Sequence, residues 1–241
     1  MNRLAIIDWG IGGFGFWKEW RKLRPGEGAI YFSDSGFTPY GKVPDDELAD
    51  RLKEIIANLR NNHGITHCLI ACHSASTVFS QVNCEGVAVS GIIGGTVDFI
   101  KATIPFGEVG LAGGRRTIES QTYHRLLSEY QVRGLIAQPL SAAVEAGRLH
   151  GPEMEALVSQ TLKDSPSHLV LACTHYVALR PVIEKVFPGI TLHDPIPSIA
   201  SCFHQAWPEM DSTSTFLTSG SLEEMKDGAW NAFGVRIDEM T

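Results

Sequence analysis

Two cysteines stand where a protein could use a pair of thiols as acid and base. Cys72 and Cys173 each end a short apolar run, and the serine or threonine that follows predicts the start of a helix. The free N–H groups and the dipole at a helix start favour a thiolate over a thiol. Since a thiolate can remove a proton and a thiol can return one, two of them on opposite faces of a carbon atom could invert its configuration.

The segments that end in these cysteines resemble each other. Residues 67–72 read HCLIAC and residues 168–173 read HLVLAC, so histidine, two apolar positions, alanine and cysteine coincide. A weaker echo pairs residues 5–10 with residues 109–114, where an apolar run again ends in a turn that contains glycine. We therefore expect two related halves, each presenting one cysteine at the same structural position.

Short apolar runs alternate with helical patterns along the whole chain, which is typical of parallel sheets covered by helices. The clearest helical patterns are residues 45–61, opened by Pro44 and acidic side chains, and residues 152–163. The sequence thus predicts an α/β fold. The predicted strands are residues 4–7, 29–32, 68–71, 87–89, 109–111, 169–172 and 191–192.

Further candidates for acid–base chemistry lie near these cysteines or after predicted strands. Ligands of open α/β sheets bind outside the carboxyl ends of the strands, which favours Asp8 as a site residue. His175 lies two residues after Cys173 and could orient or protonate its thiol, and Glu145 could steer a neighbouring base. The turn at residues 113–117 opens a predicted helix and could hold a carboxylate group.

A glycine-rich turn offers an alternative function. Residues 10–15 read GIGGFG after a predicted strand, and Asp34 ends another, which together fit a dinucleotide-binding fingerprint. However, Asp8 would bring a carboxylate close to a pyrophosphate, and bulky Trp9 precedes the first glycine. A nicotinamide-dependent oxidoreductase is therefore the less favoured alternative, because it also leaves the paired cysteines unexplained. The cysteine spacing does not fit a structural zinc site, so we expect no metal.

Composition narrows the class of protein. The 241 residues are 44% hydrophobic and 20% charged, with a formal net charge of −7. An acidic balance without clustered Lys and Arg argues against a nucleic-acid partner. We find no apolar stretch long enough for a membrane span and no signal-peptide pattern, so we expect a cytoplasmic protein with no membrane partner. Five cysteines in mostly apolar runs indicate reduced thiols.

Five blocks of the chain, taken together, resemble the signature motifs of glutamate racemases in the aspartate/glutamate racemase superfamily. They are residues 8–13 (DWGIGG), 39–41 (PYG), 71–76 (ACHSAS), 117–120 (TIES) and 172–176 (ACTHY), in the family's order and spacing. The resemblance covers essentially the whole chain, down to residues 215–220 (TFLTSG).

The resemblance implies two pseudo-symmetric α/β domains, each a mostly parallel sheet flanked by helices, with the active site between them. Residues 1–94 and 198–241 would form the first domain and residues 95–197 the second. The implied activity is the racemisation of glutamate, a small-molecule substrate, by a two-thiol mechanism without pyridoxal phosphate, other cofactor or metal. Such an activity supplies D-glutamate for peptidoglycan. A homodimer is left open.

The resemblance also assigns roles to individual residues, in two groups. The implied catalytic residues are Cys72, Cys173, Asp8, His175 and Glu145. The implied substrate-binding residues are Trp9, Tyr40, Gly41, His73, Ser74, Thr117 and Thr174.

Two departures from the family pattern affect the predicted lining. Trp9 stands where the family usually has serine, and His73 where it usually has asparagine. An indole and an imidazole predict a narrower pocket with different hydrogen bonds. The substrate could therefore differ from glutamate, and a racemase-like protein that has lost turnover and serves as a binding or regulatory module is a further alternative.

Overall fold

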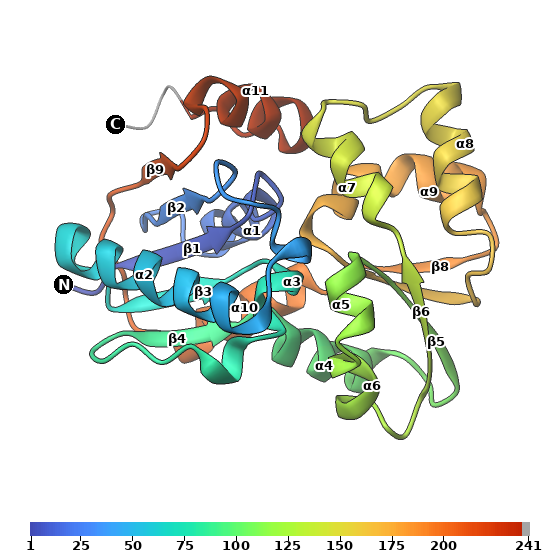
Figure 1. The fold of residues 1–241 in the computed structure, drawn as a ribbon, viewed down its shortest axis with the longest axis horizontal. Coiled ribbons are helices and arrows are strands. Elements are labelled where there is room, and N and C mark those ends of the chain that lie inside the picture. The colour runs from blue at the N-terminus through green and yellow to red at the C-terminus, as the bar shows by residue number, and fades with distance from the viewer. Residues whose placement is uncertain (238–241) are drawn as a thin grey trace.

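Two all-parallel sheets lie side by side in the computed structural model, which describes residues 1–237 (Figure 1). The first sheet contains β1 (Leu4–Asp8), β2 (Ile30–Ser33), β3 (His67–Ile70), β4 (Ala88–Gly91) and β9 (Thr215–Thr218), in the order β4-β3-β1-β2-β9. The second contains β5 (Glu108–Gly113), β6 (Gln131–Ile136), β7 (His168–Ala172) and β8 (Thr191–His193), in the order β6-β5-β7-β8. Apart from β9, the two strand orders are the same, so the predicted α/β fold of two pseudo-symmetric halves is confirmed.

Helices cover both faces of each sheet. The α-helices are α1 (Phe14–Leu23), α2 (Asp45–His63), α3 (His73–Ser76), α4 (Ile92–Thr103), α5 (Arg115–Glu119), α6 (Thr122–Leu126), α7 (Gln138–Glu145), α8 (Pro152–Thr161), α9 (Arg180–Val186), α10 (Ile196–Ala206) and α11 (Leu222–Phe233). In the first half, α1 and α10 pack together on one face of the sheet and α2 covers the other face. In the second half, α4 and α6 lie on the face opposite α7, α8 and α9. The 3₁₀ helices are η1 (Tyr40–Lys42), η2 (Phe79–Gln81) and η3 (Thr174–Leu179).

The alternation of side chains along the central strand β1 builds two cores at once. Leu4 and Ile6 point to the face covered by α1, whereas Ala5 and Ile7 point to the face covered by α2. All four are fully buried. Burial of an aliphatic side chain of the size of leucine contributes roughly 1.5–3 kcal/mol, so this strand is held from both sides and its carboxyl end is a rigid place for Asp8.

Two strands have no counterpart in the sequence prediction. β6 alternates between exposed and half-buried residues except for the buried Leu135, and β9 is half-buried throughout. Both lie at an edge of their sheet, where one side of the strand meets solvent and the apolar pattern is weak. β9 returns the chain to the first sheet by pairing with β2.

The helices that follow the two cysteines are shorter than the sequence analysis expects. α3 after Cys72 has four residues, and η3 after Cys173 is a 3₁₀ helix of six residues. A macrodipole sums over many aligned peptide groups, so helices this short contribute little of it. These short segments therefore offer little of the expected helix-dipole stabilisation at either sulfur.

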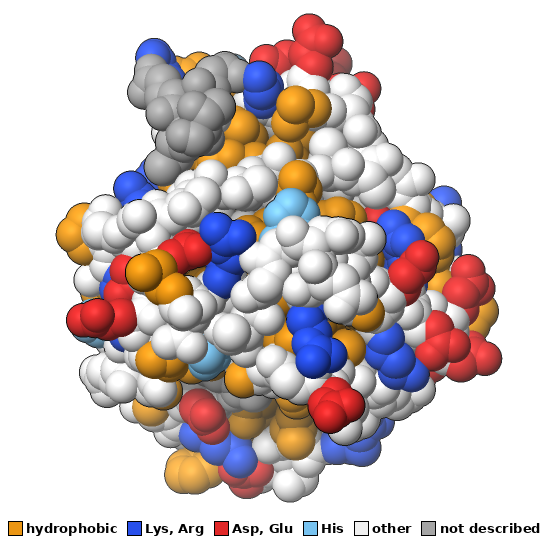
Figure 2. Space-filling model, turned by 90° about the vertical axis from the view of Figure 1, so that its left-hand side faces the viewer, with side chains coloured by type: hydrophobic (Ala, Val, Ile, Leu, Met, Phe, Trp, Pro, Cys, Tyr) orange, Lys and Arg blue, Asp and Glu red, His pale blue; other side chains and the backbone are white. Residues whose placement is uncertain are grey.

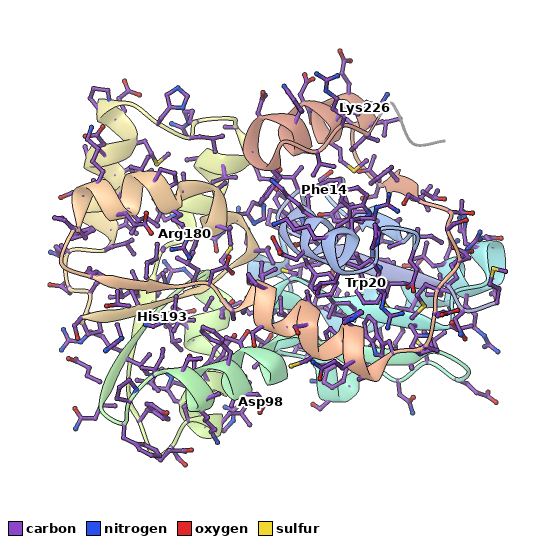
Figure 3. The ribbon with its side chains drawn as sticks, turned by 180° about the vertical axis from the view of Figure 1, so that it is seen from behind. Phe14, Trp20, Asp98, Arg180, His193 and Lys226 are labelled. Carbon is purple, nitrogen blue, oxygen red and sulfur yellow. The ribbon has the colours of Figure 1, made fainter. Side chains whose placement is uncertain are left out.

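Two helices carry the chain across the boundary between the halves. α4 and α10 pack against each other there, which is visible from behind in Figure 3. A Cβ on Gly95 would come within 2.9 Å of Cγ1 of Ile199, so glycine permits this close approach. The predicted division, with breaks after residues 94 and 197, falls within these two helices and stays a prediction.

The face in Figure 2 is the end of the molecule that carries the first sheet. Among the described residues on that face, basic and acidic side chains are interspersed and do not gather into a patch of one sign. Nucleic-acid-binding surfaces carry clustered Lys and Arg, so this face does not have their character. Within residues 1–237, no helix is both long enough and apolar enough to cross a membrane.

Candidate active site

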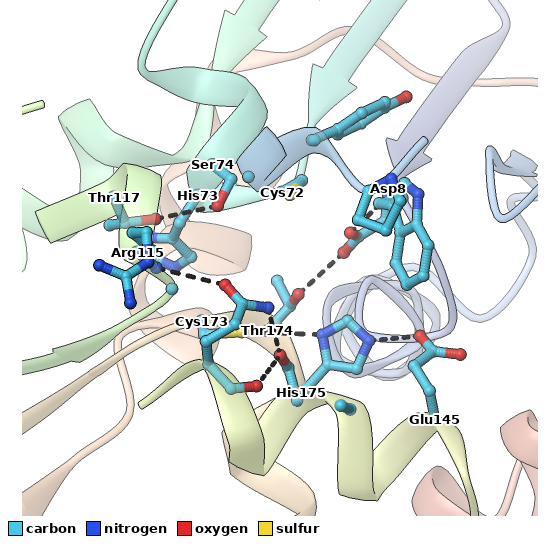
Figure 4. A pocket seen from close by; sticks show the side chains of 18 of the residues that line it. Asp8, Cys72, His73, Ser74, Arg115, Thr117, Glu145, Cys173, Thr174 and His175 are labelled. Atoms are coloured by element: carbon cyan, nitrogen blue, oxygen red, sulfur yellow. Dashed lines mark hydrogen bonds and ion pairs between the residues drawn. The ribbon is translucent and has the colours of Figure 1, made fainter. Parts of the chain in front are cut away.

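A cavity of about 560 Å³ lies between the carboxyl ends of the two sheets. Asp8 ends β1 and Cys72 follows β3 in the first sheet, whereas Cys173 follows β7 in the second, so the meeting of the two carboxyl edges brings these residues to one place. Figure 4 shows Cys72 and Cys173 on opposite sides of the space. The lining includes every residue that the sequence predicts for the site, namely Asp8, Trp9, Tyr40, Gly41, Cys72, His73, Ser74, Thr117, Glu145, Cys173, Thr174 and His175.

The Cys72 thiol is held at the end of β3 by a local network. Ser76 Oγ donates to the carbonyl of Ile70 (3.0 Å) and accepts from the backbone N–H of Ile92 (3.1 Å), which fixes the turn around Cys72. Burial and the neighbouring Asp8 carboxylate raise the pKa of Cys72 well above its ordinary value, against the opposing effect of backbone N–H donors. The expectation of a thiolate at Cys72 is therefore wrong for this structure, because burial outweighs the donors.

A chain of hydrogen bonds runs away from Cys173. The sulfur lies 3.7 Å from Nδ1 of His175, and Nε2 of His175 lies 2.5 Å from Oε1 of Glu145. Burial lowers the pKa of His175, but the bonds to Cys173 and Glu145 outweigh it, so this pKa is raised well above its ordinary value. Burial also raises the pKa of Glu145, and His175 more than offsets it, so that pKa is lowered. The pair is therefore an imidazolium and a carboxylate, with the imidazolium beside the sulfur.

Asp8 joins the two halves of the molecule inside the cavity. Its Oδ1 accepts from the backbone N–H of Trp9 (2.7 Å), and its Oδ2 accepts from the hydroxyl of Thr174 in the other half of the molecule (2.8 Å). The residue is fully buried. Burial raises its pKa, while the charge of His175 and the Thr174 hydrogen bond oppose that rise. Burial thus makes this carboxyl group, which stands beside Cys72, a weaker acid than a solvent-exposed aspartate.

The glycine-rich turn packs against the second half and does not form an open phosphate cradle. A Cβ on Gly10 would lie 1.8 Å from Oε1 of Glu145, and one on Gly12 would lie 2.2 Å from Oγ1 of Thr174. The backbone N–H of Ile11 already donates to Glu145 (2.9 Å). Glycine is needed here because side chains of the other half approach the backbone, so the nicotinamide alternative is not favoured.

Asp34, the acidic residue of that alternative, serves the cavity wall. It is fully buried and accepts from Arg51 (2.6 and 3.0 Å) and from the Tyr40 hydroxyl (2.9 Å). The Ser219 hydroxyl also donates to it (2.8 Å). Its carboxylate is therefore committed to holding Tyr40 in the wall and is not free to bind a ribose.

The side of the cavity away from Asp8 and Glu145 is rich in hydroxyl groups. Ser74 Oγ and Thr117 Oγ1 lie 3.2 Å apart and belong to different halves. The lining continues outward with Lys42 and Arg115, which are both exposed. The cavity is thus acidic on one side and carries hydroxyl groups and cations on the other.

The two departures from the family pattern have defined surroundings. Trp9 is half-buried and its Nε1 donates to the carbonyl of Phe37 (3.0 Å). His73 is buried, with Nδ1 bonded to the Tyr123 hydroxyl (2.7 Å), and burial lowers its pKa to about 3. His73 is therefore neutral. The cavity volume of about 560 Å³ lies within the roughly 300–1,000 Å³ of small-molecule sites, so the indole leaves room for an amino acid.

Sequence reasoning missed several lining residues, of which Gln138, Ser141 and Lys42 are polar. Gln138 and Ser141 belong to α7, which begins directly after the unpredicted strand β6. Pro139 at the start of that helix was the available signal, because proline is frequent in the first turn of a helix. Elsewhere in residues 1–237, as in the cavity, no three His, Cys, Asp or Glu side chains are grouped so that they could hold a metal ion.

Comparisons with known proteins agree with this geometry. A family model described as Asp/Glu/Hydantoin racemase matches residues 21–202. The chain is 32% identical over 205 residues to a glutamate racemase from Exiguobacterium sibiricum, covering 80% of this chain and 75% of that one. Its structure resembles glutamate racemase from Thermus thermophilus in complex with beta-chloro-D-alanine (TM-score 0.82, 26% identity, 99% and 98% of the two chains). It also resembles a glutamate racemase isoform from Bacillus anthracis (TM-score 0.86, 22% identity, 98% and 95%).

Proposed function

The chain belongs to the Asp/Glu/hydantoin racemase family and is an amino-acid racemase, and on that premise we propose that it interconverts L- and D-glutamate through Cys72 and Cys173. The observation that supports this mechanism best is the position of the two sulfurs on opposite sides of one cavity, each beside its own acid–base partner. Glutamate is proposed because the curated relatives that match the chain are named glutamate racemases.

The polarity of the cavity supports one orientation of an amino acid. The Asp8 carboxylate attracts the ammonium group and repels carboxylates, whereas the charge of Glu145 is balanced by the His175 imidazolium. The carboxylates of the substrate therefore turn toward Ser74 and Thr117, whose hydroxyl groups can donate hydrogen bonds to them. In this orientation Cα lies between the two sulfurs, and both of its faces can exchange a proton.

The proposed reaction moves one proton at each face of Cα. In one direction the thiolate of Cys173 takes the α-proton, and the electron pair of the C–H bond is delocalised into the substrate carboxylate. The thiol of Cys72 then donates its proton to the opposite face, which forms a new C–H bond with inverted configuration. Cys173 is left as a thiol and Cys72 as a thiolate, which is the state that the reverse reaction requires, and nothing is oxidised or reduced.

The partners of the cysteines supply different help. The imidazolium of His175 donates to the sulfur of Cys173 and stabilises its thiolate, while Glu145 holds the ring in place. Asp8 and burial keep Cys72 in the thiol form. Cys72 is therefore ready to give a proton at the start of the direction in which Cys173 is the base.

The test is a racemisation assay by circular dichroism with purified protein, L- or D-glutamate and no added cofactor. We expect turnover in both directions and incorporation of deuterium at Cα in heavy water, because the returned proton comes from an exchangeable thiol. Cys72→Ser and Cys173→Ser should each abolish turnover. Cys84→Ser is the matched control, since Cys84 is half-buried and does not line the cavity.

Three results would contradict the proposal. Normal turnover by folded Cys173→Ser protein would exclude the two-thiol mechanism. A product that keeps its original α-hydrogen in early turnover would exclude proton exchange with the protein. Binding of glutamate by the wild-type protein without racemisation, with other amino acids equally inert, would favour the binding-module alternative.

The assembly and location of the protein remain predictions. A homodimer is checked by sedimentation velocity of the purified chain, and a cytoplasmic location by fractionation of cells that express it. Neither affects the proposed chemistry, because both thiols and all their partners described above belong to one chain.

A further inference from the structure

Gln138 lies in the cavity, and the mechanism above does not use it. It is the first residue of α7, it lines the cavity and it is exposed. Its Oε1 lies 3.0 Å from the position that a Cβ on Gly114 would take and 3.5 Å from the corresponding position on Gly41. The amide therefore reaches across the cavity from α7 toward both α5 and η1, on the side that carries Ser74 and Thr117.

Its hydrogen bonds fix the orientation of this amide. Oε1 accepts from the backbone N–H of Arg115 (3.2 Å), which can only donate, so the oxygen must face that way. Nε2 donates to Ser141 Oγ (3.0 Å), and the Ser141 hydroxyl in turn donates to the backbone carbonyl of Gln138 (2.9 Å). An amide nitrogen carries two N–H donors, and within residues 1–237 the second has no acceptor. The second N–H is thus open to water or to a ligand.

We infer that Gln138 is a specificity-determining residue whose free N–H binds an oxygen atom at the end of the substrate's side chain. The inference rests on the proposed function, which places Cα between the sulfurs and turns both carboxylates away from Asp8 and Glu145. A side chain that ends in a carboxylate offers the acceptor that this N–H needs. The exposed cation Lys42, which also lines the cavity, favours a carboxylate over a neutral amide at the same place.

The contact lies away from Cα, so its loss should weaken binding more than chemistry. Gln138→Leu removes the donor at similar size. Because a hydrogen bond to a charged group is stronger than one between neutral groups, KM for glutamate should rise about tenfold or more, with kcat changed less than about twofold. Gln138→Glu should raise KM for glutamate further, since it sets a carboxylate against a carboxylate. The same variant should be inhibited more strongly by glutamine, whose amide can donate to the new side chain.

Gln131→Leu is the matched control. Gln131 is exposed at the first position of β6, the strand that leads into α7, and it does not line the cavity. This variant should keep the wild-type KM. Thermal unfolding of every variant shows whether it is folded, and Gln138→Asn, which keeps the amide but is too short to reach Arg115, should fall between the wild type and Gln138→Leu.

The outcomes separate this inference from the proposed function. If wild-type protein racemises glutamate and folded Gln138→Leu has an unchanged KM, the inference is wrong and the function stands. If wild-type protein racemises no amino acid, the function is wrong, and calorimetry of glutamate binding then tests Gln138 alone. Equal Kd values for the wild type and Gln138→Leu would overturn the inference, and a weakening of about tenfold in the leucine variant would support it.

Discussion

Replacement of Glu145 by glutamine tests the hydrogen-bond chain behind Cys173. Oε1 of Glu145 accepts from Nε2 of His175 (2.5 Å) and from the backbone N–H of Ile11 (2.9 Å). Glutamine has nearly the same shape, and its oxygen can still accept from Ile11. The change therefore removes the negative charge beside His175 while leaving the bond between the two halves of the molecule.

The expected loss of activity follows from the hydrogen bond between Glu145 and His175. A hydrogen bond between an imidazolium and a carboxylate is worth about 1.5–3 kcal/mol, and each 1.4 kcal/mol is about a factor of ten in an equilibrium. In Glu145→Gln, burial lowers the pKa of His175 without the opposing carboxylate. The imidazolium that stabilises the Cys173 thiolate becomes scarcer, so kcat/KM for glutamate should fall about ten- to a hundredfold at mildly alkaline pH.

The raised pKa of His175 predicts how turnover should depend on pH. The folded pKa of His175 lies above its ordinary value of 6.5, so the stabilisation from this group is complete below the unfolded pKa and is lost as pH rises through the folded one. If turnover needs the imidazolium, the alkaline limb of kcat/KM belongs to His175. That limb should move to lower pH in Glu145→Gln, and the loss of activity should shrink as the solution is made more acidic.

The assay is racemisation of glutamate by circular dichroism from about pH 6 to about pH 10, a window that begins near the ordinary His pKa and extends well above it. Glu153→Gln, an exposed carboxylate in the first turn of α8, is the control and should follow the wild-type profile. The reasoning is refuted if folded Glu145→Gln gives a profile that overlies that of the wild type, because the carboxylate would then have no influence on the ionisation of His175.

Three further changes have defined expectations. Asp8→Asn should remove most of the activity and should raise Tm at neutral pH. Burial raises the pKa of Asp8, so the contribution of this group to folding stability is lost as pH rises through that value. Each kcal/mol of folding free energy that the asparagine regains should raise Tm by about 2–4 °C, and a lower Tm would contradict this account. Cys68→Ser should keep its activity, and its free energy of unfolding in urea should fall by about 1–3 kcal/mol, since Cys68 is fully buried in the core between the first sheet and α2 and a hydroxyl there lacks a partner. Arg116→Ala should raise KM about three- to tenfold with little change in kcat, because Nε of Arg116 donates to the carbonyl of Tyr40 (2.9 Å) from the opposite half. Arg133→Ala is the control for that change, because Arg133 is exposed and likewise makes one ion pair and one contact with a backbone carbonyl. Equal KM values for the two alanine variants would exclude a positioning role for Arg116.

The sequence by itself determined the positions of the chemistry along the chain. Cys72 and Cys173 follow strands whose apolar pattern is local, and the repeated motif around them predicted two equivalent halves. A parallel sheet places the carboxyl ends of its strands at one edge, so the sequence predicted that each cysteine stands at the ligand-binding edge of its own sheet. Only the docking of the two sheets brings these two edges together. The strands that escaped prediction, β6 and β9, lie at sheet edges, where the pattern carries less information.

The tertiary structure alone decided how the site residues are paired and charged. Glu145 meets His175 and the backbone of Ile11 only because the two halves close on each other, and no sequence spacing encodes that contact. Burial beside Asp8 makes Cys72 a thiol where the local motif predicted a thiolate. Gln138 lines the cavity because the unpredicted strand β6 leads the chain into α7 at that place. Ionisation depends on the dielectric surroundings and on charges from distant segments, and these exist only once the chain has folded.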